Sequence, residues 1–78
     1  MKNELSFAKV LKFLRVKNSI SQEELAFRSD LDRTYISMLE RGIHQPTIAT
    51  LFALSKALNI KPSDMVKLVE IERDQADK

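Results

Sequence analysis

The residues best suited to chemistry lie between positions 32 and 42, and their types favour binding over catalysis. The 78-residue sequence has one histidine and no cysteine, and it shows no glycine-rich phosphate loop and no obvious pair of carboxylates at a plausible cleft. We therefore expect no enzyme activity, no metal site, and no cofactor or small-molecule ligand. Arg33, Thr34 and Ser37 instead carry hydrogen-bonding groups of the kind that read base edges in the major groove of DNA.

These side chains share one face of a predicted helix that runs from Arg33 to about Arg41. Asp32 is a suitable N-cap for this helix, and Gly42 suits the position that ends it. At about 100° per residue, the candidate base-reading side chains lie on one face and two apolar side chains lie on the opposite face. The residues expected to contact bases are Arg33, Thr34, Ser37 and Met38. The alternative is that this face is only solvated.

A second short helix precedes this one and ends at about Ser29. Its start has the capping-box sequence Ser-Gln-Glu-Glu at positions 21–24, in which the Ser21 hydroxyl accepts a backbone N–H and Glu24 reaches back to the cap. Leu31 is an apolar anchor in the turn between the two helices. Two short helices joined by a turn of about three residues are typical of a helix-turn-helix.

Three further helices are predicted, and strand-like alternation is absent throughout the sequence. Apolar spacing predicts one helix from after Ser6 to about Lys17. Thr47 is a cap for another helix with apolar residues over 48–58, and Pro62 suits the first position of a last helix that ends near residue 73. We expect residues 74–78 to fray. This length fits one domain over 1–78, so the prediction is a compact all-α fold of five helices.

The predicted last helix is apolar over a wider arc than packing against one core requires. A domain of this size has a marginal core, and the lack of cysteine leaves a second copy of the chain as the means of stabilising it. We therefore expect a homodimer with twofold symmetry. Its interface is expected to contain Met65, Leu68, Val69 and Ile71. The alternative is that the five-helix core absorbs this apolar surface.

The overall charge is too mild to identify a partner. Lys and Arg number 13 against 11 Asp and Glu, for a net charge of +2. No stretch approaches the ~20 apolar residues of a membrane span, and the first residues lack the apolar run of a secretory signal. We expect a cytoplasmic protein.

Several motifs resemble the lambdoid repressor/Cro family of helix-turn-helix proteins, also called the XRE family. They are Ser-Gln-Glu-Glu-Leu-Ala at 21–26, Leu31, Ile-Ser-Met-Leu-Glu-Arg-Gly at 36–42, and Pro-Thr at 46–47. Within this family, the segment 31–37 is similar to the recognition segment of the controller proteins of bacterial restriction–modification systems. The resemblance covers roughly residues 6–70. It implies a transcriptional regulator that binds a palindromic operator in double-stranded DNA.

The resemblance also implies contacts with the DNA backbone. Ser21 and Gln22 would place the start of their helix against a phosphate, an arrangement that suits helix N-termini. Further backbone contacts are implied for Tyr35, Arg41, His44 and Gln45. The alternatives are a Tyr35 ring half-packed against its neighbours and a His44 side chain that is only exposed.

An ion pair between the first and third predicted helices is likewise implied by the resemblance. It joins Arg15 to Glu40 and would tie the base-reading helix to the body of the domain. The alternative for Arg15 is a place on a basic surface beside Lys12. A different function also stays open, that of an antitoxin or a phage-type repressor whose main partner is another protein.

Overall fold

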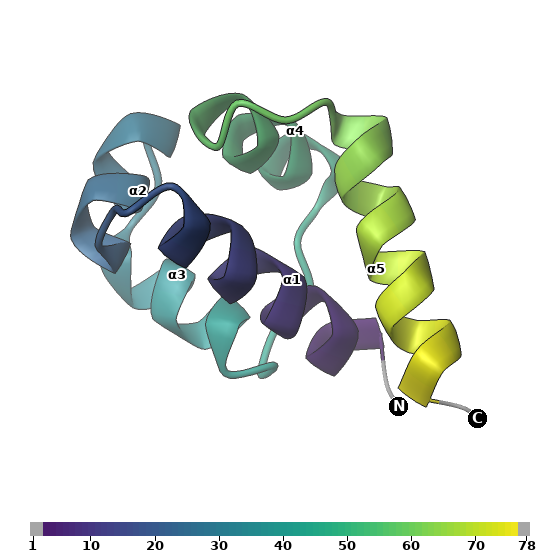
Figure 1. Ribbon diagram of the computed structural model, residues 1–78. Helices are drawn as coiled ribbons and strands as arrows, with labels where there is room; N and C mark the ends of the chain where they lie inside the picture. The colour runs from purple at the N-terminus through teal and green to yellow at the C-terminus, as the bar shows by residue number, and fades with distance from the viewer. Residues whose placement is uncertain (1–2, 77–78) are drawn as a thin grey trace.

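Five α-helices form the described part of the chain, residues 3–76 of the computed structural model, and this part contains no strand (Figure 1). The predicted all-α fold class is confirmed. The helices are α1 (Asn3–Lys17), α2 (Gln22–Ser29), α3 (Arg33–Glu40), α4 (Ile48–Ala57) and α5 (Pro62–Ala76). Figure 1 shows α1 in the middle of the molecule, with α2 and α3 on one side and α5 on the other. None of the described helices is both long enough and apolar enough to cross a membrane.

Side-chain caps fix the start of two helices. Ser21 Oγ accepts a hydrogen bond from Glu24 N at 3.0 Å, and Thr47 Oγ1 accepts one from Thr50 N at 3.0 Å. Each bond satisfies a backbone N–H that has no partner inside its helix. The predicted capping box is only half formed, because the Glu24 carboxylate accepts a bond from Arg28 Nε at 2.8 Å instead of reaching back to Ser21.

The two ends of α3 differ in how they are stabilised. Asp32 is the N-cap and has extended backbone, but its exposed side chain makes no cap hydrogen bond. At the other end, Arg41 is the C-cap and Gly42 follows with a φ of 75°. Glycine suits this position because a positive φ strains most other residues, and a Cβ there would lie 2.6 Å from Leu5 Cδ2, so the end of the Leu5 side chain would have to move. The predicted end of the helix at Gly42 is confirmed.

Two predicted helix boundaries are wrong. α1 begins at Asn3 and not after Ser6, because Ser6 is fully buried and the first turn packs onto the rest of the domain. α5 continues to Ala76 and not to about residue 73, because no proline or glycine interrupts the chain after Pro62. The predicted fraying tail is therefore helical as far as Ala76, and residues 77–78 lie outside the described part.

Each of the five helices contributes to one apolar core. The large apolar side chains that are fully buried are Leu11, Leu25, Ile36, Leu39, Leu54 and Met65. Two of these, Ile36 and Leu39, belong to α3, so the inner face of this short helix is anchored and its other face is left outward. Leu31, in the turn between α2 and α3, packs against the same core as predicted.

The apolar stripe predicted over 48–58 divides between two faces of α4. Leu51 and Leu54 are buried in the core, whereas Ile48 and Phe52 are 72% and 56% exposed. Because Ile48 and Phe52 are four residues apart, they lie on the same side of the helix. The domain core therefore leaves an apolar part of α4 uncovered.

Candidate nucleic-acid interface

The residues predicted to read bases come together on the outward face of α3. Arg33 and Thr34, in the first turn, are exposed, whereas Ser37 and Met38 are half-buried. The opposite face of the helix carries Ile36 and Leu39 in the core, so rotation of α3 about its axis would expose apolar surface. The N-terminal end of α3 is therefore the part most open to a partner.

The turn between α2 and α3 is fixed by backbone hydrogen bonds. Asp30 has left-handed backbone with a φ of 57°, and its N–H donates to the Phe27 carbonyl at 3.3 Å. The N–H of Leu31 donates to the carbonyl of the buried Ala26 at 2.9 Å. These contacts end α2 and fix the start of the turn that leads into α3, as a helix-turn-helix requires.

Arg15 of α1 and Glu40 of α3 form the ion pair that the resemblance implies. Arg15 Nε lies 2.6 Å from Glu40 Oε2, and Nη2 lies 3.0 Å from Oε1, so the pair is bidentate. The side chains are 14% and 3% exposed. The hydrogen bond to Glu40 raises the pKa of the Arg15 guanidinium, against the opposing effect of partial burial. α3 is thereby joined to α1 by a shielded contact.

Gln22 makes a contact that the sequence did not predict. Its Nε2 donates to Glu40 Oε1 at 3.1 Å, across 18 positions of the chain. No local spacing rule relates these two residues, because they meet only when α2 and α3 are packed together. The first residue of α2 is thus bonded to the last residue of α3.

The other residues implied as backbone contacts lie in different surroundings. Ser21, Arg41 and His44 are exposed, and Tyr35 is half-buried against the core, which is the packing given as its alternative. Gln45 is exposed and donates its side-chain amide to Glu4 Oε1, so the segment after α3 is bonded to the first turn of α1. Contacts of these residues with DNA stay a prediction.

The residues predicted for a dimer interface separate into core and surface. Met65 has no exposed surface, so its assignment to an interface is wrong: its side chain fills the core of its own subunit. Leu68 and Val69 are half-buried against that core, and Ile71 is exposed. The apolar residues of α4 and α5 that the core leaves most exposed, and that the predicted interface did not include, are Ile48, Phe52 and Val66.

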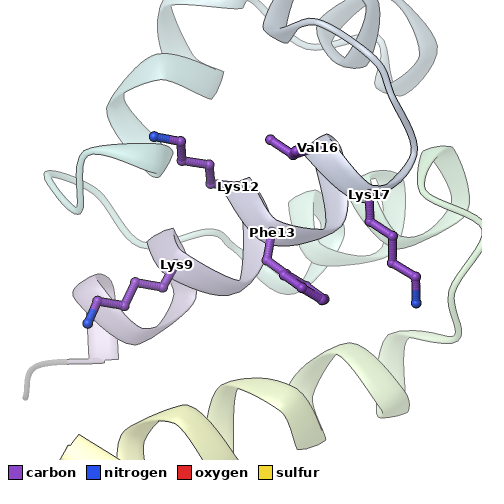
Figure 2. A pocket seen from close by; sticks show the side chains of 5 residues that line it. All are labelled: Lys9, Lys12, Phe13, Val16 and Lys17. Carbon is purple, nitrogen blue, oxygen red and sulfur yellow. The ribbon is translucent and has the colours of Figure 1, made fainter.

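The apolar part of a basic surface on α1 was also missed. Phe13 and Val16 are 60% and 58% exposed, and three lysines border them in an open hollow. Figure 2 shows these side chains on α1, with Phe13 directed toward α5 and Lys12 directed away from it. The lysines are Lys9, Lys12 and Lys17. The signal in the sequence was two apolar residues outside the buried stripe of Phe7, Val10, Leu11 and Leu14.

Comparison with known proteins shows which family has this arrangement of helices. The Helix-turn-helix family model matches residues 11–65. The control protein C.BamHI of Bacillus amyloliquefaciens is 40% identical over 68 residues, which cover 86% of this chain and 84% of that protein.

Two solved structures of restriction–modification controller proteins are similar as well. C.AhdI from Aeromonas hydrophila matches with a TM-score of 0.77 at 37% identity, over 80% of this chain and 94% of that one. C.Esp1396I, solved as a tetramer with its natural 35 base-pair operator, matches with a TM-score of 0.83 at 32% identity, over 92% and 95%. The resemblance seen in the sequence motifs is confirmed, and the chain belongs to the helix-turn-helix family of the repressor/Cro (XRE) type.

Proposed function

We propose that this chain is a sequence-specific double-stranded-DNA-binding regulator of transcription, the controller protein of a restriction–modification system, which acts in the cytoplasm as a homodimer on a palindromic operator. The observation that carries the proposal is the outward N-terminal face of α3, with exposed Arg33 and Thr34, beside the capped start of α2. The similarity to several controller proteins, one of them solved on its operator, supports the same function.

The first turn of α3 contacts the bases. A recognition helix contacts base edges mainly through its N-terminal residues, which here are Arg33 and Thr34. The Arg33 guanidinium is suited to a bidentate contact with O6 and N7 of guanine, and the Thr34 methyl group is suited to the methyl group of thymine. Ser37 and Met38 lie one turn further along and are less open, so they form the edge of this contact surface.

The start of α2 binds the DNA backbone. The N–H groups of its first turn have no partner inside the helix, apart from the one that Ser21 caps. Gln22 lies at this end, and its side chain is ordered by Glu40. A phosphate at this end would receive both backbone and side-chain donors, which fix the position of the protein without reading sequence.

The homodimer is supported by apolar surface that one subunit does not cover. Ile48 and Phe52 share a face of α4, and Val66 is half exposed on the neighbouring α5. A twofold interface over this surface would bury side chains that water otherwise contacts, whereas Ile71 lies beside Phe13 of α1. A dimer on a palindromic operator needs its two α3 helices about 34–36 Å apart, the length of one turn of DNA.

Selection of bound sequences from a pool of random duplex DNA tests the proposal. We expect enrichment of a palindrome whose half-sites are centred about 10 base pairs apart. The protein with Arg33→Ala should enrich a degenerate site, and the protein with Arg73→Ala, which removes an exposed arginine of α5, should enrich the same palindrome as the parent. A pool that shows no enrichment would contradict sequence-specific binding.

The genes next to the coding sequence test the assignment to restriction–modification. Adjacent genes for a methyltransferase and an endonuclease would support a controller protein. A neighbouring toxin gene or a set of phage genes would instead support the antitoxin or the phage-type repressor.

A further inference from the structure

One carboxylate joins three elements of the candidate interface. Both oxygens of Glu40, the last residue of α3, accept hydrogen bonds from Arg15 of α1, and Oε1 also accepts one from Gln22, the first residue of α2. Arg15 Nη1 donates in addition to the Ile20 carbonyl at 2.9 Å, just before the cap of α2. The start of α2 is thereby fixed to the end of α3.

The contact with Glu40 orders Gln22 without using all of its donors. A glutamine side-chain nitrogen carries two N–H groups, and the bond of 3.1 Å to Glu40 Oε1 uses one of them. The second N–H can therefore donate to a phosphate oxygen. A free glutamine side chain loses rotamer entropy when it binds, whereas Gln22 has lost much of it before DNA arrives.

The positive charge of Arg15 allows the Glu40 carboxylate to hold Gln22 close to a DNA phosphate. An unpaired carboxylate beside a phosphate-binding group would repel the DNA backbone. Here the Glu40 side chain is only 3% exposed, and a guanidinium contacts both of its oxygens. The pair is neutral as a unit, so Glu40 can accept the Gln22 bond without opposing a nearby phosphate.

We propose that Glu40 is a positioning residue for DNA binding: it orients the Gln22 amide toward a backbone phosphate and couples that contact to the position of the base-reading helix. This inference rests on the proposed function, because it assumes that Gln22 contacts DNA. Arg15 supplies the compensating charge, and Glu40 supplies the acceptor.

A double-mutant cycle on DNA affinity tests the coupling. The probe is duplex DNA of random sequence, and Gln22→Ala is measured in the parent and in a protein with Arg15→Leu and Glu40→Leu. The apolar pair removes both buried charges together, which preserves folding better than removing one of them. Any direct effect of losing Arg15 or Glu40 on affinity cancels, because both proteins compared in the leucine background, with and without Gln22→Ala, lack these two residues.

We expect Gln22→Ala to weaken binding about tenfold in the parent, as for a hydrogen bond to a charged group. In the Arg15→Leu, Glu40→Leu background, the same change should weaken binding less than about twofold, because the unpositioned amide contributes little. The matched control is Gln75→Ala, an exposed glutamine of α5, which should leave affinity unchanged in both backgrounds.

Nuclear magnetic resonance of the free protein gives a readout that does not depend on stability. The side-chain amide of Gln22 should be more ordered than that of Gln75 in the parent, and as mobile as Gln75 in the Arg15→Leu, Glu40→Leu protein. If the apolar pair fails to fold, the parent alone decides: an ordered Gln22 amide supports the inference, and a mobile one overturns it.

The possible results distinguish a failure of the positioning role of Glu40 from a failure of the proposed DNA-binding function. An equal loss on Gln22→Ala in both backgrounds, or no loss in the parent, overturns the positioning role while operator binding through Arg33 is retained. If the parent binds neither random duplex nor any selected sequence, the proposed function fails and the inference fails with it.

Discussion

Leu5 of α1 lies against Gly42, the residue that ends the base-reading helix. A Cβ at position 42 would be 2.6 Å from Leu5 Cδ2, and the backbone there has a φ of 75°. Gln45 adds a second link from the same segment to α1, through its bond to Glu4. The first turn of α1, which sequence spacing did not predict, therefore helps to hold the chain that leaves α3.

Gly42→Ala should lower the free energy of unfolding by about 1–2 kcal/mol, because alanine is strained at positive φ. Urea unfolding of the purified protein measures this loss. Adding Leu5→Ala removes the crowded methyl group but not the strain of the backbone, so stability should not return. A Gly42→Ala protein as stable as the parent would show that the left-handed conformation is not required.

Arg15→Ala should lower the free energy of unfolding by ~3–5 kcal/mol, because it leaves the Glu40 carboxylate buried without its partner. The contact involves two bonds and a Glu40 side chain that is 3% exposed, so solvent compensates little. Replacing both residues, as Arg15→Leu with Glu40→Leu, should restore most of the loss. A thermal melt of Arg15→Ala that coincides with the melt of the parent would refute a structural role for the ion pair.

The caps of α4 and α3 should differ in their contribution to stability. Thr47→Ala should cost about 1 kcal/mol, because Thr47 Oγ1 accepts the Thr50 N–H. Asp32→Ala should cost clearly less, since the Asp32 side chain makes no cap hydrogen bond. Parallel urea titrations compare the two variants, and equal losses would contradict this ranking.

Phe52→Asp should shift the protein from dimer to monomer, because it places a charge in the apolar surface proposed for the interface. Phe13→Asp is the matched control, since the two phenylalanines are similarly exposed, at 56% and 60%. Sedimentation equilibrium at micromolar concentration distinguishes the two assemblies. Dissociation by Phe13→Asp alone would assign the interface to α1, and a monomeric parent would refute the dimer.

Local rules predicted most of the fold. Capping residues placed the starts of α2 and α4, and Gly42 and Pro62 marked an end and a start that the structure confirms. These features depend on a few neighbouring residues, which a sequence displays directly. The first turn of α1 was missed because its burial at Ser6 depends on packing against distant parts of the chain, which local spacing does not show.

The candidate site was predicted less completely than the fold. The periodicity of α3 separated its outward face from Ile36 and Leu39, and the resemblance implied the bond between Arg15 and Glu40. The bond from Gln22 to Glu40 depends on the crossing of two helices, which no spacing rule describes.

The apolar residues of α4 and α5 show a second feature that sequence patterns could not predict. An apolar residue beyond the main stripe can face either the core or a partner, and hydrophobicity is the same in both cases. The sequence assigned Met65 to a partner, whereas the structure buries it and exposes Phe52 and Val66. Only the relative placement of α4 and α5 decides between these outcomes.

The affinity of the Arg33→Ala protein for its selected operator and for random duplex DNA, measured at one salt concentration, tests the central claim most directly. Arg33 is exposed at the start of α3, so the change should leave the fold intact. A base contact worth about 1–3 kcal/mol predicts roughly a 5- to 150-fold loss on the operator, with binding to random DNA almost unchanged. Gln22→Ala should weaken both, because a phosphate contact carries no sequence information. An equal loss by Arg33→Ala on both DNAs would contradict the assignment of α3 as the helix that reads bases.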